Sequence, residues 1–441
     1  MTDVKRTDLT VRLERAILAG VILPGDTVDA ENRLDELTQL ARTAGARVVG
    51  TVTQKRRAAD SAYFIGSGKA GELKEMAKAE KANVIIFDHD LAPGQLKNLE
   101  IATDTKVVDR SELILDIFAT HARSAAAKVQ VELAQLEYTL PRLRRMWKHL
   151  GRQEGGIGTR GPGEQQLEVD RRRVRRRIGD LKSRIRTIEK RRHSEVRGRG
   201  DEYCVSLVGY TNAGKSTLMN QLTGAGVKVE DKLFATLETR TRPWEFSGGR
   251  RVLLSDTVGF IRNLPHHLIA SFKATLEEAN AADLMLHIVD GAHPEAEHQI
   301  EAVVGVLEQI GCGETPVLLV LNKYDAVEDL AAFNVLAACH PGAIVISART
   351  GGGTEDLTRA VGQEISRRFM EVNIEFPAAD GKLYARLCRR GEILSQGTVD
   401  ESIQLRLRIA RPVLEKIVGE FPSVGFLPDS PDVLETDEDD G

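Results

Sequence analysis

The alternation of apolar and polar residues in the first part of the chain predicts short strands separated by helices. Residues 46–54 and 83–90 have strand-like apolar runs, with a helical stretch at 71–81 between them. Residues 105–118 repeat a strand followed by a helix, for which Asp109 or Ser111 is a suitable N-cap. We therefore expect an α/β domain with a mainly parallel sheet over residues 1–122.

Heptad spacing follows in residues 123–199. One apolar stripe is formed by Val129, Leu133, Leu136, Leu140, Leu143, Trp147 and Leu150. A second is formed by Val174, Ile178, Leu181, Ile185 and Ile188. Two such stripes predict an antiparallel helical hairpin, which Pro141 should kink or divide. The connection GRQEGGIGTRGPG is either a flexible linker or a basic tip that becomes ordered against RNA.

The second half of the chain predicts two further domains. Residues 200–367 repeat strand, loop and helix, and residues 368–441 suggest a small βαβα module with an acidic tail. In that module residues 402–410 alternate apolar with basic side chains, as in a half-exposed strand. Nothing in it carries recognisable chemistry. The fold class we expect is a multidomain α/β protein ending in a small α+β module.

Composition narrows the class of protein. The 441 residues include 41% apolar and 29% charged side chains, which suits several soluble globular domains. No run of 18 apolar residues is present, so we expect no membrane span and a cytoplasmic protein. We also expect a monomer. The four cysteines are far apart and form no C-x-x-C pair, which argues against a disulfide framework or a zinc site.

Positive charge is concentrated in one segment. Residues 141–199 contain 20 Lys/Arg and 7 Asp/Glu, which is +13 in a chain of net charge −4, so the remainder carries −17. This asymmetry indicates a polyanionic partner such as RNA. The candidate RNA-binding residues are Arg152, Arg160, Arg171, Arg172, Arg173, Arg175, Arg176 and Arg177. The alternative, a solvated helix face, is disfavoured because the last six arginines have no acidic neighbour in their seven-residue run.

A phosphate-binding loop is predicted where an apolar strand meets a helix, at residues 203–222. Residues 209–216 match G-x-x-x-x-G-K-S, in which glycines let backbone N–H groups approach phosphates. Lys215 would reach the β- and γ-phosphates, and the Ser216 hydroxyl would ligate Mg²⁺. The nucleotide-binding residues expected here are Gly209, Tyr210, Thr211, Asn212, Ala213, Gly214, Lys215, Ser216 and Thr217.

A second element, SDTVGFI, follows a strand at residues 251–255. Asp256 can hold Mg²⁺ through water, and the Gly259 N–H can meet the γ-phosphate. Thr236 or a neighbouring threonine should contact both the Mg²⁺ ion and the γ-phosphate. A hairpin around Gly248 and Gly249 would add one antiparallel strand to a parallel sheet.

Two later strands end in residues suited to guanine. NKYD supplies Asn322, Lys323 and Asp325, whose carboxylate can accept from the guanine N1–H and exocyclic amine, which adenine cannot match. The second strand is followed by Ser347, Ala348 and Arg349, and the Ala348 N–H can meet guanine O6. Four elements in this order, each at the carboxyl end of a strand, predict a GTP/GDP site in a P-loop domain with a mostly parallel, doubly wound sheet.

A weaker phosphate-loop signal lies in the N-terminal part. YFIGSGKAGEL contains Gly-x-Gly-Lys, but Tyr63 and Ala70 stand where such a loop needs glycine and Ser or Thr. A glycine turn into a helix explains the sequence better. A second nucleotide site there stays open.

These motifs together resemble the HflX family of translation-associated GTPases. The resemblance rests on GPGE at residues 161–164 and on GYTNAGKST, LFATLETRTR, DTVGFI and NKYD, and it covers nearly the whole chain. It implies GTP-dependent binding to the large ribosomal subunit and its RNA, hydrolysis stimulated by the ribosome, and splitting or rescue of stalled ribosomes under stress. It also implies that the N-terminal half reaches towards the peptidyl-transferase centre.

The family pattern assigns further residue roles. It makes Thr236 the switch threonine, and Asn212 resembles the loop asparagine that helps to hold a stimulatory K⁺ in related GTPases. The family's usual FATLDPTTR stands here as FATLETRTR, and the C-terminal module varies between members.

Catalysis should depend on Lys215, Thr236 and Gly259, because phosphoryl transfer needs charge stabilisation and a positioned water. Phe260 stands where many GTPases have a water-orienting glutamine, and it has no hydrogen-bonding group. We therefore expect slow hydrolysis by the protein alone. The alternatives are a GTP-gated RNA-binding adaptor that scarcely hydrolyses GTP, and an ATP-driven RNA-remodelling enzyme powered from the N-terminal domain.

Overall fold

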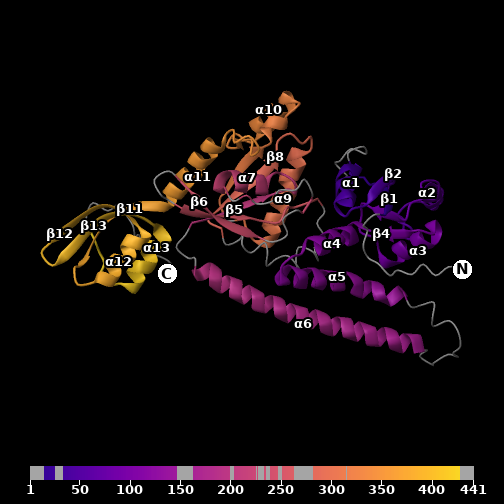
Figure 1. Ribbon diagram of the computed structural model, residues 1–441, viewed down its shortest axis with the longest axis horizontal. Coiled ribbons are helices and arrows are strands. Elements are labelled where there is room, and N and C mark those ends of the chain that lie inside the picture. Colours follow the sequence, from indigo (N-terminus) through magenta and orange to yellow (C-terminus); the bar gives the residue numbers. More distant parts are fainter. Residues whose placement is uncertain are drawn as a thin grey trace, which may run out of the picture.

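The computed structural model describes residues 14–24, 33–146, 162–198, 203–224, 226, 233–234, 239–246, 251–262, 282–313 and 315–427 (Figure 1). Within these ranges the strands form one six-stranded and two four-stranded sheets. The expected fold class, a multidomain α/β protein with a small α+β module at its C-terminal end, is confirmed. No helix among the described residues is long and apolar enough to cross a membrane.

The N-terminal sheet is entirely parallel, as predicted, with strand order β2-β1-β3-β4. Its strands are β1 (Arg15–Ile22), β2 (Arg47–Lys55), β3 (Val84–Phe87) and β4 (Lys106–Val108). Its helices are α1 (Arg33–Thr43), α2 (Ser67–Ala79), α3 (Pro93–Thr103) and α4 (Arg110–His121). Asp109 is the N-cap of α4, accepting from the Glu112 N–H at 2.9 Å. The sequence interpretation did not identify β1, α1 or α3.

Helices α5 (Ala125–Met146) and α6 (Pro162–Gly198) pack against each other (Figure 1). Leu181 of the predicted stripe is fully buried, and Lys182 pairs with Glu137 at 2.8 Å beside it. Pro141 lies within α5 and does not divide it. Trp147, Leu150 and the glycine-rich connection lie outside the described residues.

The six-stranded sheet has the order β10-β9-β8-β5-β7-β6. Its strands are β5 (Cys204–Gly209), β6 (Arg240–Glu245), β7 (Arg251–Asp256), β8 (Leu284–Asp290), β9 (Val317–Asn322) and β10 (Ile344–Val345). The associated helices are α7 (Lys215–Thr223), α9 (Ala296–Ile310), the 3₁₀ turn η1 (Tyr324–Ala326), α10 (Leu330–Cys339) and α11 (Thr354–Arg368). Strand β6 runs antiparallel to β7, as predicted, whereas Gly248 and Gly249 lie outside the described residues.

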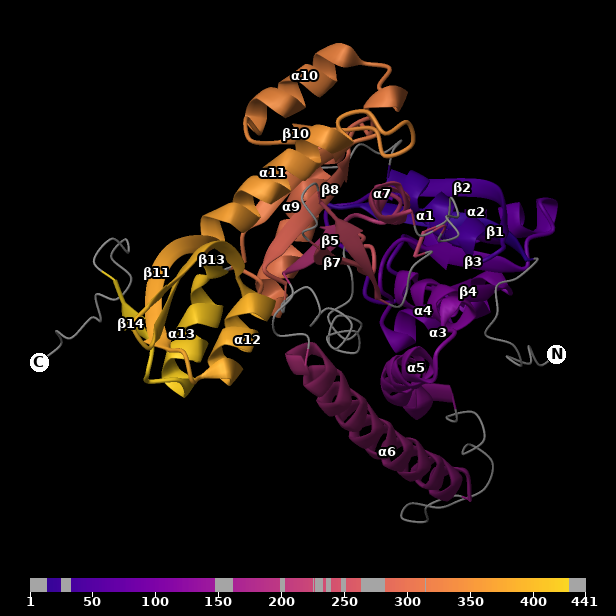
Figure 2. The same ribbon diagram turned by 60° about the vertical axis from the view of Figure 1, so that its left-hand side comes forward.

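The C-terminal module differs from the βαβα expectation. It contains β11 (Phe369–Pro377), α12 (Gly381–Arg390), β12 (Glu392–Val399), β13 (Ser402–Ala410), α13 (Arg411–Glu420) and β14 (Gly425–Phe426). The order β12-β13-β11-β14 gives an antiparallel sheet in a split βαβ arrangement, with α12 and α13 on one face (Figure 2). Strand β12 was missed because nearly all of its residues are exposed, which removes the alternation that marks a half-buried strand.

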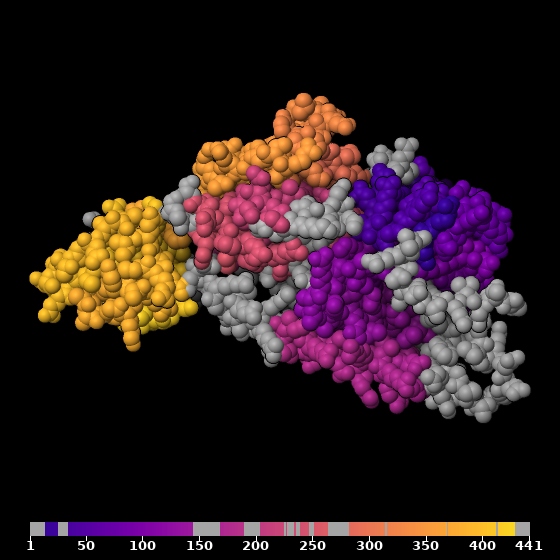
Figure 3. All heavy atoms as spheres, in the orientation of Figure 1, coloured from indigo at the N-terminus to yellow at the C-terminus, as the bar shows by residue number. Residues whose placement is uncertain are grey.

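The N-terminal part and the six-stranded sheet share one apolar core. Phe118 of α4 packs edge-on against Phe234, with ring centroids 4.7 Å apart, and both rings are buried. In the space-filling view the N-terminal part, coloured indigo to purple, is in direct contact with the part that contains the six-stranded sheet, coloured magenta to orange (Figure 3). A shared core holds the N-terminal sheet in a defined position beside the second sheet.

His287, buried at the centre of β8, gives a prediction for stability. Burial, with the nearby charges of Lys215 and His340, lowers its pKa from the ordinary 6.5 to about 4. The unfolded chain therefore takes up a proton first as the pH falls. We expect the free energy of unfolding to decrease between about pH 6.5 and pH 4, by on the order of 3 kcal/mol from this group.

Urea titrations of the wild type and His287→Leu across this pH window measure the effect. The variant should lose most of the pH dependence in this window. An equally steep dependence in the variant would show that other groups cause it.

Candidate functional site

The loop between β5 and α7 has the backbone shape that its glycines allow. Gly209 has φ +146° and Gly214 has φ +95°. A Cβ atom at position 209 would lie 2.2 Å from the Ile288 carbonyl oxygen, and one at position 214 would lie 2.3 Å from Nδ2 of Asn322. Both positions therefore require glycine, which fixes how closely the loop passes β8 and β9.

Lys215, the first residue of α7, folds over this loop. Its ammonium donates to the carbonyl oxygens of Gly209 (3.0 Å) and Tyr210 (2.8 Å). Burial lowers the pKa of Lys215 to about 8, partly opposed by the charge of Asp256. A buried ammonium at the start of a helix suits an anionic ligand, which would supply a better counter-charge than two carbonyls.

The expected metal ligands Ser216 and Asp256 lie together. The Ser216 hydroxyl donates to Oδ2 of Asp256 at 2.6 Å, and Asp256 is fully buried. A hydroxyl and a carboxylate are the hard oxygen donors that Mg²⁺ accepts, so these residues fit that ion. Mg²⁺ bound here would neutralise phosphate charge. Thr236, the third expected ligand, lies outside the described residues.

The segment after Asp256 is joined to the phosphate loop through its backbone. The Phe260 N–H donates to the Gly209 carbonyl (3.1 Å), and the Thr211 N–H donates to the Phe260 carbonyl (2.7 Å). A Cβ at Gly259 would lie 2.7 Å from Cα of Thr211 and 3.1 Å from Nζ of Lys215. The glycine is therefore needed for this close approach.

The Phe260 side chain does not enter the site. The residue is 2% exposed and belongs to the same hydrophobic core as Phe118 and Phe234. It therefore supplies packing, and it offers no group that could hold a water molecule.

Asn322 connects two parts of the site. Its side-chain amide donates to the Ala213 carbonyl (2.8 Å), and its side-chain oxygen accepts from the Ala348 N–H (2.9 Å). The N–H expected to meet guanine O6 is thus directed to Asn322 in this structure. Lys323 donates to Asp290 at 2.7 Å.

Asp325 lies just after the carboxyl end of β9, and two neighbouring side chains hold it in place. It accepts from the Ser347 hydroxyl at 2.5 Å and forms an ion pair with Arg349. These contacts lower the pKa of Asp325, the Ser347 hydrogen bond being the larger cause. Asp325 is therefore ionised at neutral pH and acts only as an acceptor, as recognition of two N–H donors on one base edge requires. Two further expected nucleotide-binding residues lie on the loop and helix: Asn212 is exposed and Thr217 is half-buried.

The candidate RNA-binding arginines differ in their surroundings. Arg177 makes a two-pronged contact with Glu132 of α5, at 2.7 and 2.9 Å. Arg173 lies 3.7 Å from Asp170, and Arg171 is half-buried. Three side chains are exposed on α6 without a carboxylate partner among the described residues, namely Arg172, Arg175 and Arg176. Arg152 and Arg160 lie outside the described residues.

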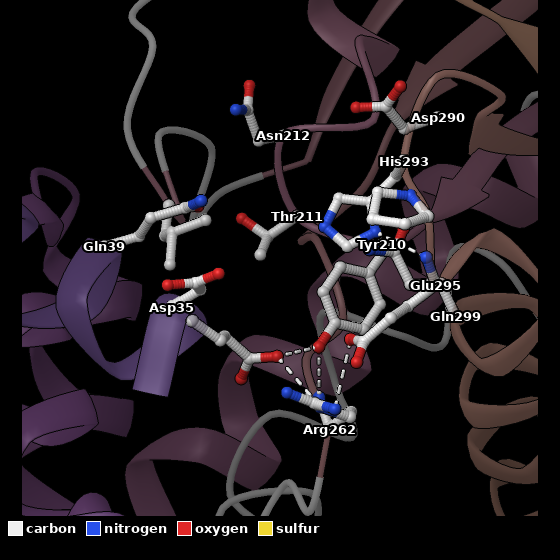
Figure 4. Close-up of a pocket in the computed structure, with 13 residues that line it drawn as sticks. Asp35, Gln39, Tyr210, Thr211, Asn212, Arg262, Asp290, His293, Glu295 and Gln299 are labelled. Carbon is white, nitrogen blue, oxygen red and sulfur yellow. Dashed lines mark hydrogen bonds and ion pairs between the residues drawn. The ribbon is translucent and has the colours of Figure 1, made fainter. Parts of the chain in front are cut away.

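A polar cavity of about 160 Å³ lies beside the phosphate loop, between α1 and the start of α9 (Figure 4). Tyr210 and Thr211 of the loop line it together with Glu36, Arg262 and Glu295. Sequence motifs gave no signal for Glu36, Arg262 or Glu295, because these residues come from three distant segments that only the fold brings together.

Three segments match known families. Residues 31–119 match the family described as GTP-binding GTPase N-terminal, residues 121–199 the GTP-binding GTPase middle region, and residues 204–323 the 50S ribosome-binding GTPase. The matches cover strands β2, β3 and β4 of the N-terminal sheet, helices α5 and α6, and strands β5 to β9 of the six-stranded sheet.

Curated relatives cover nearly the full length. GTPase HflX of Caldanaerobacter subterraneus subsp. tengcongensis is 43% identical over 406 residues, or 92% of this chain and 93% of the relative. GTPase HflX of Escherichia coli is 42% identical over 405 residues, or 91% of this chain and 94% of the relative. A solved GTP-binding protein from Sulfolobus solfataricus in complex with GDP is 24% identical, with a TM-score of 0.42 over 80% of this chain and 99% of that chain.

Proposed function

This chain belongs to the HflX family of GTPases, and we propose that its GTP hydrolysis is coupled to binding of the large ribosomal subunit. It is a GTP hydrolase with a domain of the ribosome-binding GTPase class. The coupling would serve to split or rescue stalled ribosomes under stress. Its support is the 50S ribosome-binding description of residues 204–323 and the basic character of α6.

The site residues have complementary roles in this proposal. Lys215 and the Gly259 N–H hold the β- and γ-phosphates, and Asp325 holds the guanine edge. Thr236 closes on the γ-phosphate, and water attacks it to give GDP and phosphate. GTPases of this class generally use Mg²⁺, which Ser216, Asp256 and Thr236 would hold.

The observation that carries the ribosome dependence is the burial of Phe260. A phenylalanine ring has no hydrogen-bonding group, and this one is buried while its backbone is bonded to Gly209 and Thr211, so this position supplies no group that could position a water. Hydrolysis is then slow until the ribosome positions Thr236 and the segment around Gly259 or supplies a polar group.

Sedimentation with ribosomal subunits under GDP, GTP and a non-hydrolysable analogue tests the binding, and single-turnover hydrolysis with and without ribosomes tests the stimulation. We expect sedimentation with the large subunit under GTP or the analogue, and a ribosome-dependent burst of phosphate. Sedimentation without a burst would indicate the RNA-binding adaptor instead. Equal sedimentation under GDP and GTP would contradict the coupling. Exchanging K⁺ for Na⁺ in the same assay tests a stimulatory K⁺ at Asn212.

Arg172, Arg175 and Arg176 are the residues of α6 that we propose to contact ribosomal RNA, since their side chains are exposed. Replacing all three with Gln should reduce the slope of log Kd against log salt concentration by roughly 2 to 3, because each phosphate contact contributes about 0.7 to 0.9. Filter binding to large subunits at several salt concentrations measures this slope.

The matched control is Arg177→Gln, which removes one arginine of the same run that is already paired with Glu132. It should change the slope by less than any single member of the exposed group. An unchanged slope in the triple variant would mean that this face of α6 points away from the RNA.

A further inference from the structure

Tyr210 of the phosphate loop joins two parts of the chain through its hydroxyl. The side chain is 5% exposed. The hydroxyl donates to the Glu36 carboxylate of α1 and accepts from the Arg262 N–H at 2.8 Å. Figure 4 shows the ring pointing towards Arg262. A residue inside the nucleotide-binding motif is thus bonded both to the N-terminal part and to the segment that follows Gly259.

Arg262 is held through both of its backbone groups and through its guanidinium. Its N–H donates to Tyr210, and its carbonyl accepts from Arg110 of α4 at 3.0 Å. Its guanidinium lies 3.4 Å from Glu36 and 3.2 Å from Glu295. A residue with both backbone groups and its side chain engaged has little freedom to move.

Glu36 and Arg110 are themselves fixed within the N-terminal part. Arg110 is 4% exposed, forms an ion pair with Glu36, and contacts Asp88 at 2.6 Å. Removing one member of a buried charged group leaves its partners without compensation. The N-terminal part therefore provides a rigid anchor for Arg262.

Gly259 lies three residues before Arg262 in the chain. It is in close contact with Thr211 and Lys215 of the phosphate loop and α7. We propose that Glu36 and Arg110 are positioning residues for the γ-phosphate: through Tyr210 and Arg262 they hold Gly259 where its N–H can bind GTP. GDP has no γ-phosphate, so its affinity does not depend on this position. The N-terminal part thus sets the preference for GTP over GDP, by preorganising the loop before the nucleotide arrives.

Tyr210→Phe and Glu36→Gln test the proposal in the full chain without ribosomes. Tyr210→Phe removes only the hydroxyl that faces Glu36 and Arg262, and it keeps the loop backbone that is expected to approach the phosphates. Binding of fluorescent GDP and of a non-hydrolysable GTP analogue is measured for each. We expect the Kd for the analogue to rise at least about five-fold and the Kd for GDP to stay within two-fold, since about one hydrogen bond to a charged group is lost. Arg110→Lys should raise the Kd for the analogue by a smaller factor, because lysine keeps the positive charge but cannot make the forked contact of arginine.

Tyr138→Phe is the matched control, because it also removes a buried tyrosine hydroxyl bonded to a glutamate, Glu112 at 3.2 Å, but on α5 and away from the loop. It should leave both affinities unchanged. Equal losses of GDP and analogue binding, or no loss in either test variant, would overturn the proposal. Far-UV circular dichroism identifies a test variant that fails to fold. In that case the nucleotide affinities of the other test variant decide whether the proposal holds. The outcome is independent of the ribosome assays, since only nucleotide affinity is read.

Discussion

Asp325→Asn is expected to lower the affinity for GDP and GTP by about 100-fold or more, and to create affinity for xanthosine diphosphate. In the proposed site the carboxylate would accept two N–H donors from guanine, whereas asparagine offers one acceptor and one donor, so its amide would face the guanine amine donor to donor. Xanthine has a carbonyl in place of that amine and restores the match. Competition of each nucleotide against fluorescent GDP measures the change.

Asp329→Asn is the matched control for this exchange. Asp329 caps α10 by accepting from the N–H groups of Ala331 and Ala332, and asparagine caps helices equally well. The control should bind guanine nucleotides normally and reject xanthosine diphosphate. Normal GDP affinity in Asp325→Asn would show that this carboxylate does not face the base.

Gly259→Ala is expected to reduce the rate of GTP hydrolysis by about 100-fold or more, because a displacement of about 1 Å at a catalytic group can cost that much. The added Cβ would lie 2.7 Å from Cα of Thr211, which is backbone and cannot rotate away. The two segments must therefore separate, and the Gly259 N–H, which we propose meets the γ-phosphate, moves with them. Single-turnover hydrolysis at saturating GTP measures the loss.

Gly305→Ala in α9 provides the control, since nothing lies within 4 Å of its added Cβ. It should leave the rate unchanged and stabilise the helix slightly, by up to about 1 kcal/mol. A wild-type rate in Gly259→Ala would mean that the loops separate without affecting catalysis.

Local patterns predicted much of the fold. The parallel N-terminal sheet and the two packed helices were indicated by apolar periodicity, since burial on one face imposes it. The antiparallel strand β6 was indicated by the hairpin expected around Gly248 and Gly249. The patterns failed where burial was unusual. Strand β1 is buried on both faces and has no alternation, and β12 is exposed along nearly all its length.

The sequence by itself indicated the ligand class and the family of this protein. Gly209, Lys215 and Asp325 are specified by short motifs, because each lies within a few residues of the strand end that positions it. A motif of this kind carries its own local backbone shape, so ligand class and family can be inferred without the fold.

Only the tertiary structure decided which residues support that chemistry from a distance. Glu36, Arg110 and Arg262 meet at Tyr210 although up to 226 positions separate them in the chain. The structure also showed that Phe260 is a core residue and that Arg177 is occupied by Glu132. These outcomes depend on how sheets and helices pack, and packing brings together side chains whose spacing along the chain follows no local period.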